Sequence, residues 1–220
     1  SLPNERLSIE NNYSSQDLTN SGRKMVLTTF SAALLSELDI VILGVFYSGP
    51  ILGVLAWSKR ILEGLYQLVG ASLDIVFPEI SKLNDTEEIS GVRSKLRIVI
   101  LISLLIPVTY ILLENVAKSV FINVLGSEFE NLASIFSVVI FSLPFMLWSR
   151  INIIFARAMH YEVDLFKIII AAASSSFLLY FINDTYNYFA IEYGILGSQI
   201  LFSIFTSFLI NSHIKKERNM

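Results

Sequence analysis

Charged side chains lie deep inside two long apolar stretches near the start of the chain. The first stretch reads MVLTTFSAALLSELDIVILGVFY, and the second reads ILGVLAWSKRILEGLYQLVGASLDIVFP. Their charged residues are Glu37 and Asp39 in the first, and Lys59, Arg60, Glu63 and Asp74 in the second. Ionisable groups are costly in hydrocarbon and normally face a bundle interior or a watery cavity. These residues are therefore the first candidates for binding an ionic substrate or for coupling to an ion gradient.

The two stretches meet at the turn Ser48-Gly49-Pro50. Asp39 precedes this turn by about 10 residues, and Lys59 and Arg60 follow it at about the same distance, so a rise of about 1.5 Å per residue brings these groups to one depth. An unpaired charge at the centre of a bilayer costs about 2.5 to 3.5 kcal/mol on insertion scales. We therefore expect Asp39, with Glu37 as a second carboxylate, to pair with Lys59 or Arg60.

Polar or small residues recur at steps of three or four along the second stretch. They are Arg60, Glu63, Gln67, Gly70 or Ala71, and Asp74. This spacing places them on one face of a helix. We interpret the stripe as the lining of an aqueous path, and the alternative is a helix packed against polar partners.

Arg150 is a second candidate for an anion site. It lies between the apolar runs FSLPFMLW and INIIFA, and the planar fork of arginine suits phosphate oxygens. Arg157 lies on nearly the same face but needs no function, because a long cationic side chain can snorkel to the interface. In the last apolar stretch, four polar residues share a face and are expected to make helix-packing contacts. They are Gln199, Ser203, Ser207 and Asn211.

The composition is that of an integral membrane protein. Hydrophobic residues make up 54% of the chain and charged residues only 16%, and the apolar residues come in long blocks instead of alternating with polar ones. Without the alternation of barrel strands, the spans must be helices. We predict an all-α membrane fold with six transmembrane helices, at residues 25–47, 51–77, 96–113, 132–156, 166–181 and 195–210. Residues 1–24 are interpreted as a polar cytoplasmic linker, residues 25–214 as the transmembrane lobe, and residues 215–220 as a basic cytoplasmic tail.

Lysine and arginine near the span ends predict the orientation, because cytoplasmic loops are enriched in them. One side of the predicted lobe collects Arg23, Lys24, Lys82, Arg93, Lys95, Arg97, Arg157, Lys167, Lys215, Lys216 and Arg218. The loops of the other side hold Lys118 and the carboxylates Glu114, Glu128, Glu130, Asp184 and Glu192. Both ends of the chain are therefore expected in the cytoplasm. Pro107 and Pro144 fall inside predicted spans and should bend them.

Several function classes are excluded or disfavoured. The chain has no cysteine, which excludes disulfides and thiolate chemistry, and its net charge of -3 argues against nucleic acid as a partner. His160 and His213 are expected at helix ends near the interface and not as metal ligands, since a metal site needs several converging ligands. The sequence has no G-x-S-x-G, H-E-x-x-H or Walker-type glycine loop, so we predict neither an enzyme nor a cofactor.

Three short elements resemble a known family. They are LSELDIVILGVF followed by a Ser-Gly turn, GVLAWSKRI, and IVFPEISKL near the next cytoplasmic end. The most specific points are Asp39, the A-x-x-x-R-I element at Ala56, Arg60 and Ile61, and the helix end PEISKL at residues 78–83. Together they look like the start of the C-terminal lobe of Wzx-type flippases, which are bacterial polysaccharide-biosynthesis transporters of the MATE-like MOP superfamily. The likeness is strongest over residues 25–83 and continues as hydropathy to residue 214.

The resemblance implies a protein of twelve helices in two six-helix lobes, of which this chain is the second. It also implies that an undecaprenyl-diphosphate-linked oligosaccharide moves from the cytoplasmic to the outer leaflet of the bacterial inner membrane by alternating access. The N-terminal six-helix lobe would then be the partner of this one. The segment NSGRKMVLTTF departs from the family, which usually has more glycine and proline at the start of this lobe.

A polyprenyl diphosphate combines an anionic head, a bulky polar glycan and a long apolar tail. Its passage therefore needs a hydrated cleft with positive charge, together with an opening to lipid for the tail. Arg60, Arg150 and Lys59 are the candidates to meet the diphosphate or acidic sugars. Four carboxylates are the candidates to hold these cations in place or to change protonation during the cycle. They are Asp39, Glu37, Glu63 and Asp74.

Three other functions remain open from the sequence. A MATE-type exporter of small molecules would need a cavity dominated by carboxylates, with few cations. A membrane-embedded polysaccharide polymerase or acyltransferase would be expected to place its polar chemistry in a sizeable extracytoplasmic loop. The third alternative is a purely structural lobe that binds partners.

Overall fold

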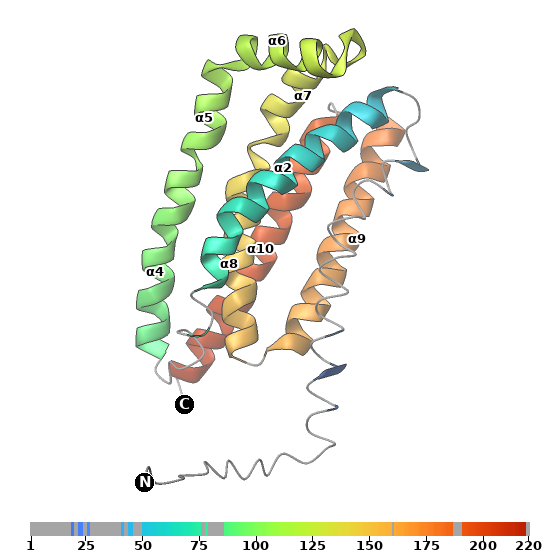
Figure 1. Cartoon of the computed structure of the whole chain (residues 1–220). Coiled ribbons are helices and arrows are strands. Elements are labelled where there is room, and N and C mark those ends of the chain that lie inside the picture. Colours follow the sequence, from blue (N-terminus) through green and yellow to red (C-terminus); the bar gives the residue numbers. More distant parts are fainter. Residues whose placement is uncertain are drawn as a thin grey trace, which may run out of the picture.

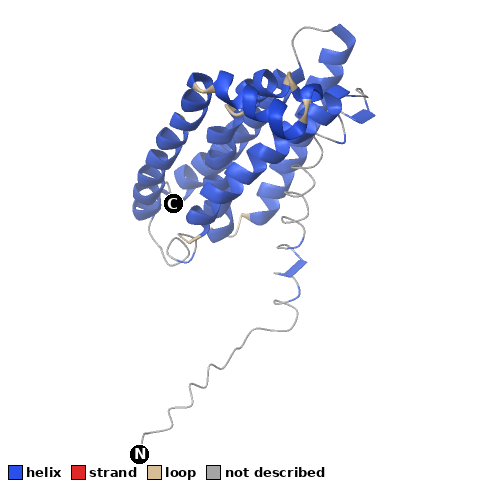
Figure 2. Ribbon diagram, turned by 45° about the horizontal axis from the view of Figure 1, so that its top comes forward, coloured by secondary structure: helices blue, strands red, loops and turns tan. Residues whose placement is uncertain are grey.

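The structure is a computed structural model that describes most of the chain after residue 49. It describes residues 50–75, 86–159, 161–186 and 191–218, together with residues 19, 22, 23, 26, 41, 44, 45 and 78. The regular elements in these ranges are all helical, as Figure 2 shows. The prediction of an all-α membrane protein is confirmed.

The described helices follow one another along the chain in a fixed order. They are α2 (Pro50–Asp74), α4 (Thr86–Ser103), α5 (Leu105–Leu112), α6 (Glu114–Leu125), the short 3-10 helix η1 (Ser127–Phe129), α7 (Leu132–Val139), α8 (Ser142–Ala158), α9 (Glu162–Tyr186) and α10 (Ile191–Arg218). The first predicted span, residues 25–47, lies almost wholly outside the described residues.

The core of the lobe lies around α7 and α8. Helix α8 packs against α10, α4 and α2, while α9 lies against the outer side of α10 (Figure 1). Phe136 of α7 and Phe155 of α8 are the largest fully buried side chains, and Leu55 and Leu62 of α2 are buried with them. These apolar contacts fix α2 against α7 and α8, and so determine which face of α2 remains exposed.

Three segments of the described chain are long and apolar enough to cross a membrane. They are Gly91–Leu112, Leu132–Ala158 and Glu192–Lys216, and they coincide with the third, fourth and sixth predicted spans. The second and fifth predicted spans fall in α2 and α9, which are helices of 25 residues each. Helix α2 carries Lys59, Arg60 and Glu63 within five residues, which sets it apart from an ordinary apolar span. The count of six spans stays a prediction.

Pro107 and Pro144 each follow a break in their helix, whereas the bend expected at each of them stays a prediction. The third span breaks at Leu104 between α4 and α5, and the fourth breaks between Val139 and Ser142. A proline removes the N–H that would bond to the carbonyl four residues earlier. For Pro144 this is the carbonyl of Ile140, which instead accepts from the N–H of Leu143 at 3.1 Å.

Helix α6 was not anticipated from the sequence, where residues 114–131 were interpreted as a connecting loop. It runs across the top of the helical bundle in Figure 1, and none of its residues is buried. The helix ends at Gly126, whose φ of 103° is accessible to glycine but strained for other residues. Lys118 of α6 forms an ion pair with Glu130 at 3.0 Å, which ties this helix to the connection that leads into α7.

The two ends of the lobe differ in charge. The start of α4, the end of α8, the start of α9 and the end of α10 lie together at the bottom of Figure 1. The basic residues of this end are Arg93, Lys95, Arg97, Arg157, Lys167, Lys215 and Lys216. The opposite end carries Glu114, Lys118 and Glu130 on and beside α6, with Glu192 at the start of α10. The expected loop before residue 96 was wrong, because Arg93 and Lys95 lie in α4, where Arg93 is buried and Lys95 is exposed.

Candidate functional site

Helix α2 presents an exposed polar stripe, which begins at Arg60. The Arg60 side chain is 72% exposed and forms an ion pair with Glu63, one helical turn on, at 3.7 Å. Gln67 and Ala71 are also exposed, and the ideal Cβ position of Gly64 has no atom within 4 Å. We call Arg60, Glu63, Gly64, Gln67 and Ala71 the α2 stripe. These residues therefore share one face of α2, as their spacing predicted, and the described helices leave that face uncovered.

Lys59 lies on a different face of α2. It is 5% exposed, whereas its neighbour Arg60 points away from the lobe. Its predicted carboxylate partners, Asp39 and Glu37, lie outside the described residues, and so does the side chain of Asp74. The pairing of the two apolar stretches through these charges stays a prediction.

Arg150 of α8 packs against the inner face of α2. Its guanidinium carbon lies 5.0 Å from the centre of the Tyr66 ring, in a cation–π contact. A Cβ at Gly70 would lie 2.7 Å from the same carbon, so the absence of a side chain there makes room for the arginine. Gly70 is ten residues beyond Arg60, or about 15 Å along the helix. The structure therefore brings Arg150 to α2, but at a different level from Arg60.

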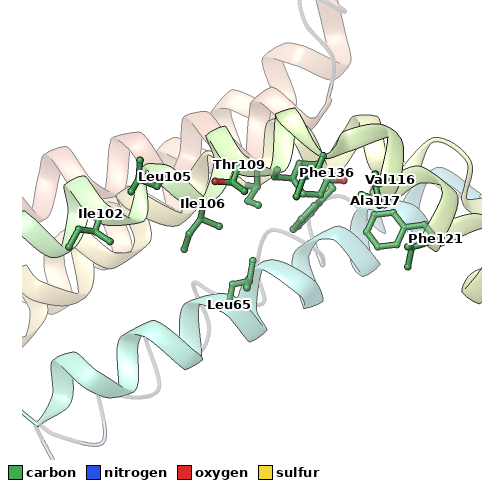
Figure 3. Close-up of a pocket in the computed structure, with 13 residues that line it drawn as sticks. Leu65, Ile102, Leu105, Ile106, Thr109, Val116, Ala117, Phe121 and Phe136 are labelled. Atoms are coloured by element: carbon green, nitrogen blue, oxygen red, sulfur yellow. The ribbon is translucent and has the colours of Figure 1, made fainter.

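An apolar groove lies between α2 and the α4–α5–α6 segment. Its volume is about 630 Å³, and its lining is almost entirely hydrocarbon. Figure 3 shows Leu65 of α2 across the groove from Ile102, Leu105 and Ile106, with Phe136 of α7 at the same site. The Tyr110 hydroxyl, a rare polar group there, donates to the carbonyl of Ala133 at 3.1 Å. Leu65 is the neighbour of Tyr66, so the groove lies beside the helix that also contacts Arg150.

Sequence reasoning missed a buried polar network centred on Arg93. Its two terminal nitrogens donate to the amide oxygens of Asn211 at 2.6 Å and Asn152 at 2.8 Å. The guanidinium also lies over the Trp148 ring at 5.1 Å. Because α4, α8 and α10 each contribute a residue, this network joins the three segments that can cross the membrane.

Helix α10 completes the network. The Trp148 indole N–H donates to the Ser207 hydroxyl at 2.6 Å, and the Asn152 amide donates to the same oxygen at 3.1 Å. Ser207 in turn donates to the carbonyl of Ser203 at 2.7 Å. Ser207 and Asn211 therefore make the helix-packing contacts that were expected of them, whereas the Ser203 hydroxyl donates within α10 to the carbonyl of Ile200 at 2.8 Å. For Gln199 the expectation stays a prediction. A sequence signal for the network did exist: Asn152 interrupts the apolar run INIIFA.

A second polar cluster joins the start of α9 to the end of α10. Asp164 forms an ion pair with Lys167 at 2.9 Å, and its other carboxylate oxygen lies 3.4 Å from Nε2 of His213. The hydrogen bond from Lys167, together with the nearby positive charge, lowers the pKa of Asp164. His213 also stacks on the Tyr161 ring at 3.8 Å, so its place at the end of the lobe agrees with the sequence. His160 lies outside the described residues.

Comparison with known proteins identifies the family but gives no closer relative. The model of a family described as "Polysaccharide biosynthesis protein" matches residues 4–134. No curated protein and no solved structure matches the chain. The matched residues include α2, with its exposed stripe, and the polar segment that was interpreted as a linker. They cover more than half of the 220 residues. The chain is therefore a membrane protein of the polysaccharide biosynthesis protein family, as the sequence motifs indicated.

Proposed function

We propose that this protein transports a lipid-linked oligosaccharide, an undecaprenyl-diphosphate repeat unit, across the bacterial inner membrane by alternating access. The observation that carries the proposal is the α2 stripe, on which Arg60 is 72% exposed. An arginine facing hydrocarbon is costly, and such residues normally face a water-filled cavity or a partner. A hydrated cleft on this side of α2 removes that cost, and it is the environment that a polar glycan needs.

The cations of the lobe suit an anionic head group. Arg60 lies on the exposed face of α2 and Arg150 against its inner face, where Gly70 is about 15 Å from Arg60 along the helix, so each would meet a diphosphate at a different stage of its passage. Each is held in place, Arg60 by the ion pair with Glu63 and Arg150 by the Tyr66 ring and the gap at Gly70. Lys59 is proposed as a third cation for the diphosphate. The carboxylates are proposed to balance these cations or to couple transport to protonation; they are Asp39, Glu37, Glu63 and Asp74.

The apolar groove suits the other half of the substrate. Water is a poor occupant for a groove of about 630 Å³ lined by leucine, isoleucine, valine and phenylalanine. A hydrocarbon chain fits its chemistry, and its position beside α2 allows head and tail to be held by neighbouring surfaces. The uncovered α2 stripe would face the upstream six-helix lobe across the cleft, and the basic end of this lobe would lie in the cytoplasm.

Replacing the exposed arginine tests the proposal. Arg60→Ala in the full-length protein is expected to lower surface polysaccharide about fivefold, since one charge near an anionic group contributes about 1 kcal/mol. Lipid-linked repeat units should accumulate on the cytoplasmic side. Lys216→Ala, which removes an exposed charge from the end of α10, is the matched control and should have no effect.

Two outcomes would reject the proposal. Normal surface polysaccharide in Arg60→Ala cells would mean that the α2 stripe takes no part in transport. Repeat units that reach the outer leaflet but are not joined together would instead indicate a polymerising enzyme.

A further inference from the structure

Two arginines of α4 share one tryptophan ring of α8. The guanidinium carbons of Arg93 and Arg97 lie 5.1 Å and 5.8 Å from the centre of the Trp148 ring. Arg93 is 4% exposed, whereas Arg97 is exposed on the outside of the lobe. The Trp148 ring therefore contacts two cations, of which Arg93 is buried in the protein and Arg97 is exposed.

Within the described residues, no carboxylate neutralises either arginine. The hydrogen-bond acceptors of Arg93 are two neutral amide oxygens, from Asn152 and Asn211, and its Nε is buried without a hydrogen-bond partner. The cation–π contacts offset part of the desolvation cost. The positive charges of Arg93 and Arg97 nevertheless lie close together in a medium of low dielectric constant, so a nearby anion would stabilise them.

The position of Arg97 limits which anion can reach it. It lies six residues inside the span Gly91–Leu112, or about 9 Å along the helix from the start of that span. Side chains of a helix lean toward its N-terminus, which for α4 is the basic end of the lobe. The Arg97 guanidinium can therefore reach the level of lipid head groups on that side.

We propose that Arg97, with Arg93 and Trp148 behind it, binds the phosphate of an anionic phospholipid in the leaflet at the basic end of the lobe. The planar fork of Arg97 supplies the direct contacts to phosphate oxygens. Arg93 adds a second charge from inside the protein, where Asn152 and Asn211 hold it in place. This lipid site is on α4 and is separate from the α2 stripe, so it does not depend on the transport proposal.

Trp148 makes the site directly measurable. The chain has two tryptophans, and Trp57 is 46% exposed, so Trp57→Phe leaves Trp148 as the only tryptophan of the chain, which light absorbed by tryptophan and not by tyrosine excites selectively. Lipids with bromine on their acyl chains quench a tryptophan that they contact. From the quenching of Trp148, brominated phosphatidylglycerol is expected to bind roughly tenfold more tightly at this position than brominated phosphatidylcholine. One charge-assisted contact accounts for a preference of this size.

Two further variants assign this preference to Arg97. Arg97→Gln in the Trp57→Phe background is expected to reduce the preference to near one. Lys95→Gln removes an exposed charge from the same helix and should leave it unchanged. Equal thermal midpoints for the two variants would exclude unfolding as the cause.

Three results would overturn the inference. The first is equal quenching by the two lipids in the Trp57→Phe protein. The second is the same loss of preference in Lys95→Gln as in Arg97→Gln, which would indicate general attraction to a charged surface. The third is loss of the preference in the presence of excess inorganic phosphate, which would assign the site to a soluble anion.

Discussion

Asn152→Leu is expected to lower the free energy of unfolding by about 2 to 3 kcal/mol, because it removes an acceptor from a buried cation. The Asn152 amide oxygen accepts from Arg93 at 2.8 Å, and its amide group donates to the Ser207 hydroxyl at 3.1 Å. Leucine has the same number of side-chain heavy atoms and a similar branched shape but can satisfy neither group. The thermal midpoint of the purified protein in detergent measures the loss.

The matched control for this change is Asn123→Leu. Asn123 lies on α6 and is exposed, so its replacement should change stability by less than about 0.5 kcal/mol. Equal midpoints for Asn152→Leu and the unchanged protein would show that water, and not the asparagine, satisfies Arg93.

Arg150→Ala is expected to reduce transport by roughly tenfold to a hundredfold, as removal of a charge-assisted contact of about 1.5 to 3 kcal/mol predicts. Its effect should exceed that of Arg60→Ala, because Arg150 is half-buried against Tyr66 and water screens it less. The measurement is the amount of surface polysaccharide in cells that produce the variant at normal levels.

Gly70→Ala separates the position of Arg150 from its charge. The added methyl group would occupy the place of the guanidinium, so transport should fall although the arginine is still present. Gly91→Ala is the control, because nothing lies within 4 Å of its Cβ position. If Gly70→Ala transports normally, the contact between Arg150 and α2 has no part in the mechanism.

Local features of the lobe were predictable from sequence because they depend on nearby residues. The breaks before Pro107 and Pro144 follow from one missing N–H each, and the Arg60–Glu63 ion pair follows from the spacing of one helical turn. Long apolar runs likewise predicted six spans, three of which coincide with the segments long and apolar enough to cross a membrane. Each of these inferences needed only the residues of one helix.

The Arg93 network could not be predicted in the same way. Its hydrogen bonds join residues that are 59 and 118 positions apart. The helix that carries Arg93 also begins earlier than the predicted span 96–113, at Thr86. The orientation rule assumes that basic residues near span ends are solvated, and on that assumption Arg93 was expected in a loop. Only the packing of α4 against α8 and α10 shows that asparagine side chains enclose it.

The exposure of the α2 stripe depended on tertiary structure as well. The spacing of Arg60 and Gln67 predicted a common face, but it could not predict whether another helix covers that face. In the structure, Leu55 and Leu62 on the opposite side of α2 are buried against α7 and α8, which turns the stripe away from the core. The described helices therefore leave this face uncovered.

The accessibility of residue 67 to water tests the central claim most directly. The chain has no cysteine, so Gln67→Cys and Leu101→Cys each introduce a single thiol, one on the α2 stripe and one on a 64% exposed position of α4. With a charged, membrane-impermeant thiol reagent, we expect the thiol at position 67 to react and the thiol at position 101 to stay unmodified. If both thiols resist this reagent and react only with an apolar maleimide, the α2 stripe faces lipid and no hydrated cleft exists there.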